Sequence, residues 1–263
     1  MSINVILTGA NGRMGRTLHG LLDQDQRFRV SGLVVLPAEL EEVRMRASIP
    51  AFDSLEEALD RAPASVIIDF TAPEASLNFA RIAARRGLAQ VIGTTGLNGA
   101  QQAELAELAQ RAPMLWSPNM SVGITVLLKA LPEFIRMLGP EYDIEIVEIH
   151  HKKKKDAPSG TALRLGECAA SASGRALAQC ACYHREGMTG ERPGGEIGLQ
   201  TIRGGDVVGV HTVYLLGPGE RIELTHQSHS RENFAQGALR AAAWLAGRQP
   251  GRLYGIHDVL AAG

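Results

Sequence analysis

The sequence lacks an excess of charge of either sign, and this argues against one broad class of partner. Its 263 residues contain 27 Lys and Arg against 28 Asp and Glu, a net charge of −1. General nucleic-acid-binding proteins usually carry a strong basic excess, so we expect no nucleic acid partner. The four consecutive lysines at residues 152–155 are therefore a local feature.

Cysteines and long apolar runs are also scarce. Cys168, Cys180 and Cys182 form no disulfide framework, which indicates reduced thiols and the cytoplasm. Cys180 and Cys182 have no second Cys or His pair at zinc spacing, so we predict no metal. No apolar run approaches the roughly 20 residues that a membrane span needs. No basic segment precedes the strand-like residues 3–8, so we expect neither membrane association nor a signal peptide.

Short apolar runs alternate with amphipathic segments over the first 120 residues. This alternation predicts a doubly wound parallel sheet, an α/β fold. Ser54 is predicted to cap one short helix, and Gly87 to end another. The expected strands are residues 3–8, 28–36, 66–71, 90–92 and 114–116, and the expected helices include residues 73–86 and 101–111.

The turn after the first strand has the spacing G-x-x-G-x-x-G, with glycines at 9, 12 and 15. A strand, a glycine turn and a helix are the context of a dinucleotide-binding loop, whose helix N-terminus binds pyrophosphate. Asn11 stands where the usual pattern has glycine, and asparagine tolerates the left-handed region better than most residues. The alternative is a plain glycine-rich turn. In such sheets ligands lie at the carboxyl ends of strands, which makes residues 9–15, 93–96 and 117–120 candidate loops.

The end of the second strand lacks the acid that usually binds the ribose of NAD. The strand ends Val34-Val35-Leu36-Pro37, with no acid and no adjacent arginine. Glu39, Arg44 and Arg46 follow in a segment whose position the pattern does not fix. The choice between NADH and NADPH therefore stays open.

The pattern changes after about residue 120. Residues 122–138 predict a helix that is kinked at Pro132 or broken into two pieces, and residues 143–149 predict a strand. Glycine turns at 204–206 and 217–219 predict antiparallel pairing among later strands. We expect a second α+β domain with a mixed or antiparallel sheet at 121–230, and a first domain of residues 1–120 completed by 231–263. The expected later elements are a helix at 161–173, strands at 197–202, 207–216 and 221–226, and a helix at 233–245.

Residues 150–161 combine two histidines, four lysines and a Pro-Ser-Gly-Thr turn at a helix start. They bring together proton donors, positive charge and free N–H groups, which suit a small carboxylate-bearing substrate. The alternative is a solvated basic loop before an ordinary capped helix. Two other features are weaker. The loop 189–195 could be a lid, a subunit contact or a plain loop. His226, His229 and Arg231 have the composition of a metal or phosphate site, but an ordinary polar edge is favoured.

Several segments, in order along nearly the whole chain, resemble the 4-hydroxy-tetrahydrodipicolinate reductase family, also called dihydrodipicolinate reductases. The most specific match is Asp156-Ala157-Pro158-Ser159-Gly160-Thr161. The other matching segments are residues 9–15, 68–71, 91–96, 119–123, 148–161, 185–192 and 235–245.

The resemblance implies a Rossmann domain, a substrate and tetramerisation domain, and a homotetramer. It also implies hydride transfer from NADH or NADPH to a cyclic unsaturated imine dicarboxylate, in lysine and diaminopimelate biosynthesis. His150 would be the proton donor and acceptor, and Lys154 the second proton donor. Substrate would be held by His151, Ser159, Gly160 and Thr161. Cofactor would be held by Gly9, Ala10, Asn11, Gly12, Arg13, Met14, Gly93, Thr94, Thr95, Ser117, Pro118, Asn119 and Met120.

Two departures from the family pattern keep alternatives open. Leu36-Pro37 stands where the family has an acid often followed by arginine, and Lys152, Lys153 and Lys155 surround Lys154. One alternative is a paralogous reductase acting on a related cyclic imine in a secondary pathway. The other is a nucleotide-sensing protein without catalysis, which the joint presence of His150, Lys154 and the 159–161 turn disfavours.

Overall fold

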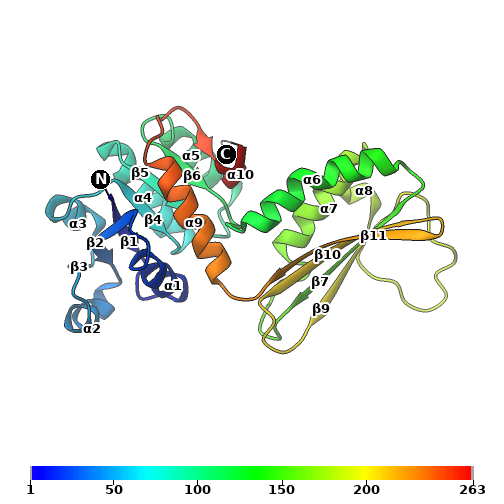
Figure 1. Cartoon of the computed structure of the whole chain (residues 1–263), viewed down its shortest axis with the longest axis horizontal. Coiled ribbons are helices and arrows are strands. Elements are labelled where there is room, and N and C mark those ends of the chain that lie inside the picture. Colours follow the sequence, from blue (N-terminus) through cyan, green and yellow to red (C-terminus); the bar gives the residue numbers. More distant parts are fainter. Residues whose placement is uncertain (1, 262–263) are drawn as a thin grey trace. The chain divides into compact units, whose positions relative to one another are not determined.

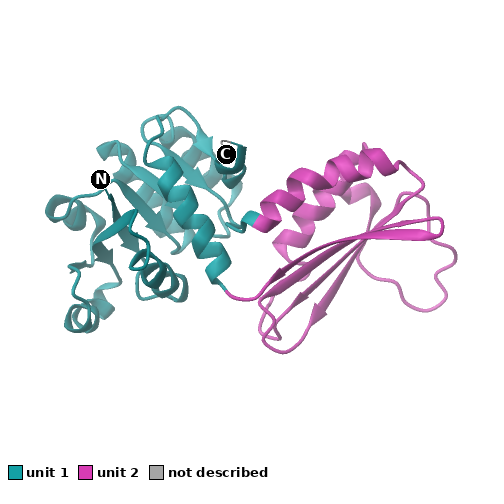
Figure 2. Ribbon diagram, viewed as in Figure 1, with its two compact units in different colours: residues 1–122, 231–263 teal, residues 123–230 magenta. Residues whose placement is uncertain are grey.

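The structure is a computed structural model that describes residues 2–261, and it divides into two compact units (Figure 2). The first unit contains the chain up to Val122 and again from Arg231 onward. The second unit is the intervening segment Gly123–Ser230. Among the described residues, no helix has both the length and the apolar character needed to cross a bilayer.

The first unit is built on seven strands that run parallel to their neighbours in the order β12-β6-β5-β4-β1-β2-β3 (Figure 1). The predicted doubly wound parallel sheet is therefore confirmed. The strands are β1 Ile3–Thr8, β2 Phe28–Val34, β3 Ala51–Phe52, β4 Val66–Asp69, β5 Ala89–Ile92, β6 Met114–Trp116 and β12 Leu253–Tyr254. The helices are α1 Arg13–Leu22, η1 Pro37–Glu39, α2 Leu40–Arg46, α3 Leu55–Arg61, α4 Pro73–Arg86, α5 Gly99–Leu108, α9 Glu232–Leu245 and α10 Ile256–Ala261.

Helices cover both faces of this sheet, so both faces are buried. Successive side chains of a strand point to opposite faces and therefore enter different cores. Val5 and Leu7 of β1 join a core with α1 and α9, whereas Ile6 between them joins a second core with α3, α4 and α5. Gly237 lets α9 pack closely on the turn after β6, since a Cβ there would lie 1.8 Å from the carbonyl oxygen of Met120. The last helical segments thus complete the first unit.

The structure confirms the two predicted local signals of this unit. Ser54 caps α3 by accepting a hydrogen bond from the Glu57 N–H at 3.4 Å, and Gly87 ends α4 with φ +62°. The second strand ends at Val34, two residues earlier than predicted, because the chain turns into η1 after Leu36. The helix expected from residue 101 begins at Gly99, where Asn98 and Gln101 form a reciprocal capping box.

The second unit is a five-stranded mixed sheet in the order β11-β10-β7-β9-β8, with α6 and α7 packed on one face (Figure 1). The mixed sheet agrees with the predicted fold class. Its strands are β7 Asp143–His150, β8 Ala181–Cys182, β9 Ile197–Arg203, β10 Gly209–Gly217 and β11 Glu220–Ser228. Its helices are α6 Val122–Leu138, α7 Gly160–Ala172 and α8 Leu177–Cys180.

One of the two predicted antiparallel hairpins is wrong. The turn at 217–219 joins β10 to β11, which pair antiparallel, but β9 and β10 do not pair because β7 lies between them. The 204–206 turn instead crosses the end of β7. The Gly204 N–H donates to the His150 carbonyl at 3.0 Å, and the Lys152 N–H donates to the Gly205 carbonyl at 3.3 Å. This turn therefore fixes the backbone that follows β7.

Helix α6 is continuous through Pro132 rather than broken into two pieces. Proline has no N–H, so the carbonyl of Leu128, four residues earlier, loses its usual helical donor. The thiol of Cys168 on α7 donates to this Leu128 oxygen at 3.4 Å. Burial raises the pKa of the Cys168 thiol, which keeps it protonated. A neighbouring helix thus satisfies the group that proline leaves open.

Candidate active site

The three candidate loops of the first unit lie at the same edge of its sheet. They follow β1, β5 and β6, which are parallel and belong to one continuous order with β4. In the first loop Gly9 has φ +62°, and a Cβ there would lie 2.7 Å from the Thr71 Cγ2. A Cβ on Gly15 would lie 2.2 Å from the Gly9 carbonyl oxygen. No described residue other than glycine has a positive φ, so Asn11 does not use the left-handed region.

The N-terminus of α1 has the chemistry of an anion site. Gly12 caps the helix without a side-chain hydrogen bond, and the first turn contains no acid. The first N–H groups of a helix have no partner within it, and the helix dipole favours a negative charge there. A tight glycine turn leading into this helix fits the pyrophosphate of a nicotinamide nucleotide.

A buried polar network holds the loops after β4 and β5. Asp69 is fully buried and accepts hydrogen bonds from the hydroxyls of Thr8 at 3.0 Å and Thr71 at 2.7 Å. Burial raises the pKa of Asp69, against these hydrogen bonds. The buried Thr94 hydroxyl accepts from the Thr71 N–H at 3.0 Å and from Ser76 at 2.7 Å. The predicted binding residue Thr94 therefore uses its side chain to support the loop.

The remaining predicted cofactor residues form close-fitting turns. The ring of Phe70 packs on Gly93, where a Cβ would lie 2.1 Å from its nearest carbon. The Ser117 hydroxyl donates to the Asn119 carbonyl at 2.6 Å, and the Asn119 side chain accepts from the Ser121 N–H at 2.8 Å. Met120 is buried in the core with α9. These turns leave mainly backbone groups for a ligand.

In the second unit, the centre of the predicted site is His150, the last residue of β7. Its Nδ1 forms a short hydrogen bond with the Glu148 carboxylate, two residues earlier on the same face of the strand. Because Nδ1 is engaged, Nε2 is the nitrogen left to exchange a proton. Burial lowers the pKa of His150, while the negative charge of Glu148 raises it. Gly209 leaves room beside the ring, since a Cβ there would lie 3.0 Å from Nε2.

Glu148 joins His150 to the start of α7. Its carboxylate is fully buried and accepts from both terminal nitrogens of Arg203, each at 2.8 Å. It also accepts from the Ser159 N–H at 3.0 Å and from the Thr201 hydroxyl at 3.2 Å. Burial acts to raise its pKa, but the hydrogen bonds from Arg203, His150 and Ser159 prevail and lower the pKa of Glu148 to about 2. Glu148 is therefore an anion at neutral pH, and it holds β7, β9 and α7 together.

A second histidine lies against this group. His211 of β10 is buried, and its ring meets that of His150 edge to face at a centroid distance of 5.1 Å. Its Nε2 lies 3.0 Å from the Ser159 hydroxyl, which also accepts from the Ala162 N–H and so caps α7. Burial, followed by the nearby His150, lowers the pKa of His211 to about 3, so this ring stays neutral.

The other predicted substrate residues surround this centre. Lys154 pairs with Asp156 at 2.9 Å, and its charge acts on both His150 and His211. The His151 N–H donates to the Val207 carbonyl at 2.8 Å, so the crossing turn positions this residue too. Gly160 begins α7, where a Cβ would meet no atom within 4 Å, and Thr161 follows it. The predicted His, Lys and Ser-Gly-Thr groups are therefore brought together.

The sequence interpretation assigned no role to three residues that organise the site. Glu148, Arg203 and His211 come from β7, β9 and β10, which are far apart in sequence but adjacent in the sheet. Only Glu148 has a signal in the sequence. It lies on the same face of the strand as Ile144 and Ile146, so the alternation places a carboxylate in the core. Arg203 and His211 had no local signal.

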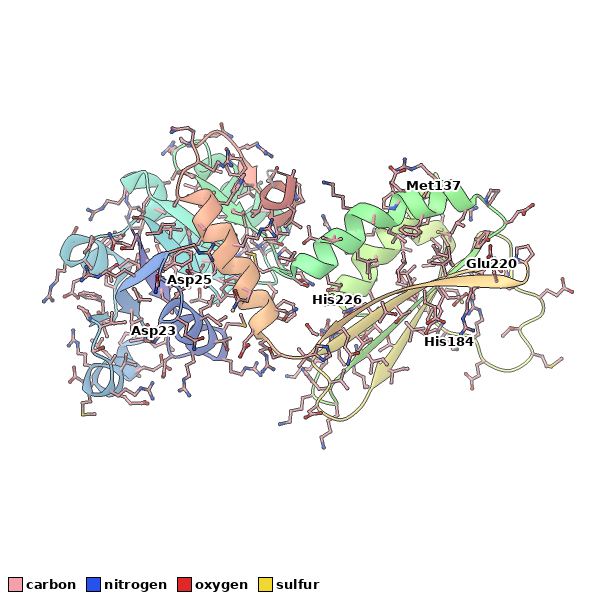
Figure 3. All side chains as sticks on the ribbon, in the orientation of Figure 1. Asp23, Asp25, Met137, His184, Glu220 and His226 are labelled. Atoms are coloured by element: carbon pink, nitrogen blue, oxygen red, sulfur yellow. The ribbon has the colours of Figure 1, made fainter. Side chains whose placement is uncertain are left out.

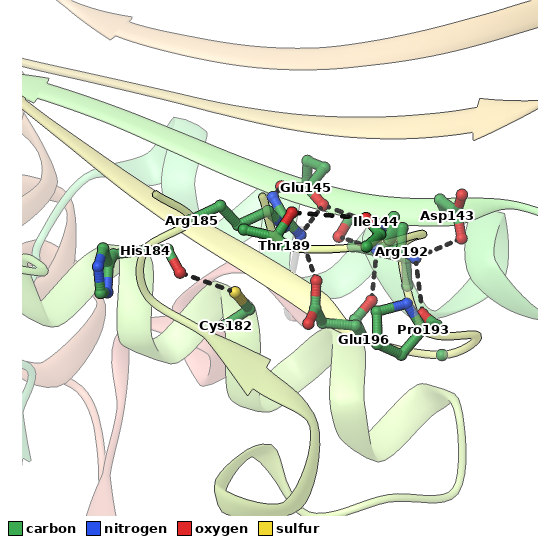
Figure 4. Close-up of polar contacts among 12 residues, drawn as sticks. Asp143, Ile144, Glu145, Cys182, His184, Arg185, Thr189, Arg192, Pro193 and Glu196 are labelled. Atoms are coloured by element: carbon green, nitrogen blue, oxygen red, sulfur yellow. Dashed lines mark hydrogen bonds and ion pairs between the residues drawn. The ribbon is translucent and has the colours of Figure 1, made fainter. Parts of the chain in front are cut away.

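The loop around residues 189–195 is tied down at the opposite end of β7 (Figure 4). Arg192 donates to Glu145 at 3.1 Å and to the Ile144 carbonyl at 3.2 Å, and it also pairs with Asp143. Arg185 binds Glu145 at 2.7 Å and pairs with Glu196. A hollow of about 230 Å³ beside this loop contains none of the predicted site residues. These contacts hold Arg185, before the loop, and Arg192, in its middle, against β7.

The weaker histidine candidate forms no recognisable metal site. His226, labelled in Figure 3, lies on β11. In the β10–β11 register it is opposite His211. Within residues 2–261 no group of three or more His, Cys, Asp or Glu side chains has an arrangement that could hold a metal ion.

The fold and the two sets of residues define a class of protein, a Rossmann-type nucleotide-dependent oxidoreductase. Two family models cover nearly all of the chain: "Dihydrodipicolinate reductase, N-terminus" matches residues 3–120, and "Dihydrodipicolinate reductase, C-terminus" matches residues 123–260. The chain belongs to the dihydrodipicolinate reductase family.

Individual relatives agree with this membership. The chain is 58% identical to the 4-hydroxy-tetrahydrodipicolinate reductase of Nitratidesulfovibrio vulgaris over 98% of its own length and all of the relative's. It is 57% identical to the enzyme of the same name from Desulfovibrio desulfuricans over 98% of this chain and 100% of that one. A dipicolinate-bound dihydrodipicolinate reductase from Paenisporosarcina sp. TG-14 has a similar fold, with a TM-score of 0.79, 22% identity, and coverage of 98% and 99%.

Proposed function

We propose that the protein reduces 4-hydroxy-tetrahydrodipicolinate to tetrahydrodipicolinate with NADH or NADPH, in lysine and diaminopimelate biosynthesis. Family membership over both units supports the reaction class. The observation that carries the proposal is that the buried Glu148 carboxylate contacts both the His150 ring and the Ser159 N–H. A solvated basic loop before an ordinary helix would not need a buried anion with a bidentate arginine.

The residues of the second unit divide the work on the substrate. The N–H groups at the start of α7, at Gly160 and Thr161, suit one carboxylate of a cyclic dicarboxylate. Lys154 supplies positive charge for the other, exchanging its pairing with Asp156 for the substrate. His151 contributes a further polar contact. The open space beside Gly160 gives such a ligand room to approach the backbone.

The reduction adds one hydride and one proton across a conjugated C=C–C=N system, which arises when the 4-hydroxyl group leaves as water. A bound nicotinamide cofactor would supply the hydride. The cofactor would be held by the β1–α1 loop and by the turns at residues 93–95 and 117–120. Protonated His150 would deliver the proton from Nε2, with Lys154 as the second donor. Glu148 holds Nδ1 and thereby fixes which nitrogen faces the substrate.

Self-association is also part of this proposal, as a homotetramer formed through the second unit. Helices α6 and α7 cover one face of its sheet. Large apolar side chains elsewhere on the unit are exposed, with Ile202 at 48%, Tyr183 at 49% and Met188 fully so. Exposed apolar side chains of this size are found at subunit contacts.

Steady-state kinetics with 4-hydroxy-tetrahydrodipicolinate and each reduced nicotinamide cofactor test the proposal. We expect kcat/KM for this substrate to exceed that for related cyclic imines by at least about 100-fold, since a site matched to two carboxylates discriminates strongly. A preference for another imine would identify a paralogue. Nicotinamide binding without turnover of any imine would identify a non-catalytic nucleotide-binding protein.

A further inference from the structure

Lysine is concentrated beside the candidate active site to a degree that the proposed reaction leaves unexplained. Of the 27 lysines and arginines in the chain, only five are lysines, and four of these are residues 152–155. The fifth, Lys129, lies on α6. Only Lys154 of the run has a role in the proposed reaction. The other three, here named the outer lysines, are Lys152, Lys153 and Lys155.

The outer lysines differ from Lys154 in their surroundings. The Lys154 side chain is 21% exposed and pairs with Asp156 at 2.9 Å. The outer lysines are exposed, and in the chain from residue 2 to residue 261 no carboxylate lies within ion-pair distance of them. An exposed arginine such as Arg81, by comparison, pairs with Glu104 at 2.6 Å. The positive charges of the outer lysines are therefore not neutralised by neighbouring acids.

The backbone holds the outer lysines beside the predicted substrate residues. The Lys152 N–H donates to the Gly205 carbonyl at 3.3 Å, and the Lys154 N–H donates to the His151 carbonyl at 3.1 Å. Consecutive Cα atoms are about 3.8 Å apart, so the Cα of every outer lysine lies within roughly 8 Å of that of Lys154. This distance is shorter than the Debye length of about 10 Å at about 0.1 M ionic strength. An anion that approaches Lys154 is therefore attracted by all four lysines.

The charge of this segment is opposite to that of the rest of the chain. Residues 150–161 contain four lysines and one aspartate, a charge of +3, and the whole chain has a net charge of −1, so the rest carries −4. The proposed substrate is a dicarboxylate, which this segment attracts and the rest of the chain repels. Lysine suits long-range attraction, because its ammonium is a compact, strongly hydrated charge on a flexible stem, whereas arginine favours fixed bidentate pairs.

We infer that the outer lysines attract the dianionic substrate from solution toward Lys154 and the start of α7, and that they do not contact it once it is bound. This inference rests on the proposed function and adds how the substrate reaches the site. Attraction of this kind acts before the chemical step, so it raises kcat/KM and leaves kcat unchanged. It weakens as salt is added, because salt screens exposed charges.

Steady-state kinetics of the full chain at two ionic strengths and saturating cofactor test the inference. The glutamine variant combines Lys152→Gln, Lys153→Gln and Lys155→Gln. Its kcat/KM for 4-hydroxy-tetrahydrodipicolinate should fall by about tenfold or more at about 10 mM ionic strength, where the Debye length is about 30 Å. At about 1 M, where this length is about 3 Å, the glutamine variant should be within about twofold of the unaltered protein. Its kcat should be unchanged at both ionic strengths.

A second variant separates charge from the shape of the side chain. Lys152→Arg, Lys153→Arg and Lys155→Arg together keep the three positive charges, so kcat/KM at low ionic strength should return to within about threefold of the unaltered value. Thermal melts of each variant exclude loss of folding, which is not expected at exposed side chains.

The matched control removes three exposed positive charges from the other end of the second unit, with Arg136→Gln, Arg175→Gln and Arg221→Gln. Arg136 and Arg175 line one hollow together with Asp143, the first residue of β7. Arg221 is linked to the same residue by register, since both are opposite Leu216 of β10. Seven residue steps separate this end of β7 from His150, roughly 23 Å at about 3.3 Å per residue. Because attraction falls with distance, the control should change kcat/KM by less than about twofold.

Three results would overturn the inference while leaving the reductase proposal intact. They are an unchanged kcat/KM of the glutamine variant at low ionic strength, a loss that persists at about 1 M or appears in kcat, and an equal loss in the control variant. Absence of turnover in the unaltered protein would instead overturn the proposed function. The same two ionic strengths, applied to the calorimetric affinity for pyridine-2,6-dicarboxylate, would then still test the attraction of a dicarboxylate by the outer lysines.

Discussion

Glu148 is the side chain on which the candidate site depends, although it is not predicted to touch the reacting atoms. It is buried, bonds Nδ1 of His150, and receives both terminal nitrogens of Arg203. Removing one partner of such a group leaves the other charge without compensation. Its two effects, on the pKa of His150 and on stability, can be measured separately.

The first effect appears in the pH dependence of the rate. Burial lowers the pKa of His150 and the Glu148 charge raises it, so Glu148→Gln lets the pKa fall further. If protonated His150 is the acid, the descending limb of kcat/KM should move to lower pH in this variant. Glu145→Gln, at the Arg192 end of the same strand, is the control and should leave the limb in place. An unshifted limb in Glu148→Gln would contradict this role for the carboxylate.

The second effect appears in the pH dependence of stability. The pKa of Glu148 is lowered from 4.5 to about 2, so the folded state gains stability from its charge above about pH 4.5 and loses it as pH falls toward 2. Glu148→Gln should cost about 3 kcal/mol at neutral pH, as expected for a broken buried pair. The difference in unfolding free energy from the unaltered protein should shrink between pH 4.5 and 2. A difference that stays constant across this range would show that the charge contributes nothing.

Helix α6 illustrates how one element depends on another. Pro132 leaves the Leu128 carbonyl without a helical donor, and Cys168 of α7 supplies one. Cys168→Ala should therefore destabilise the protein by about 1 kcal/mol in urea unfolding, the net value of a typical hydrogen bond. Cys168→Ser retains a donor and should recover part of the loss. Equal stability of all three proteins would show that the carbonyl does not need the thiol.

The same elements show what could be read from the sequence. Hydrophobic periodicity and capping residues predict the bounds of β1, α4 and α7 to within one residue, because both signals act over a few residues. The pairing of β7 between β9 and β10 was missed, because a glycine turn predicts a reversal of direction but not which strand lies alongside. His150, Lys154 and the 159–161 turn lie within twelve residues of one another, so a local pattern could nominate them, and their roles stay predictions. Arg203 and His211 reach His150 and Ser159 only through strand order, which no local pattern reveals.

For the molecule as a whole, the proposal of self-association rests on exposed apolar side chains of the second unit. Ile202→Glu places a charge on a side chain that is 48% exposed in the single chain and should dissociate the proposed tetramer. Met137→Glu is the control, since Met137 is 74% exposed on α6, which covers the other side of the unit (Figure 3). Light scattering should report smaller particles for Ile202→Glu and unchanged particles for Met137→Glu. A monomer in the unaltered protein would contradict the tetramer.

We propose that the first unit holds the hydride donor and that His150 of the second unit supplies the proton. The most direct measurement is kcat for 4-hydroxy-tetrahydrodipicolinate in His150→Gln and Lys154→Ala, with cofactor affinity measured in parallel. We predict that each substitution lowers kcat by roughly 100-fold or more, the range for general acid catalysis, while the affinity for reduced nicotinamide cofactor stays unchanged. Near-normal kcat in both variants would contradict the proton-donor roles of His150 and Lys154.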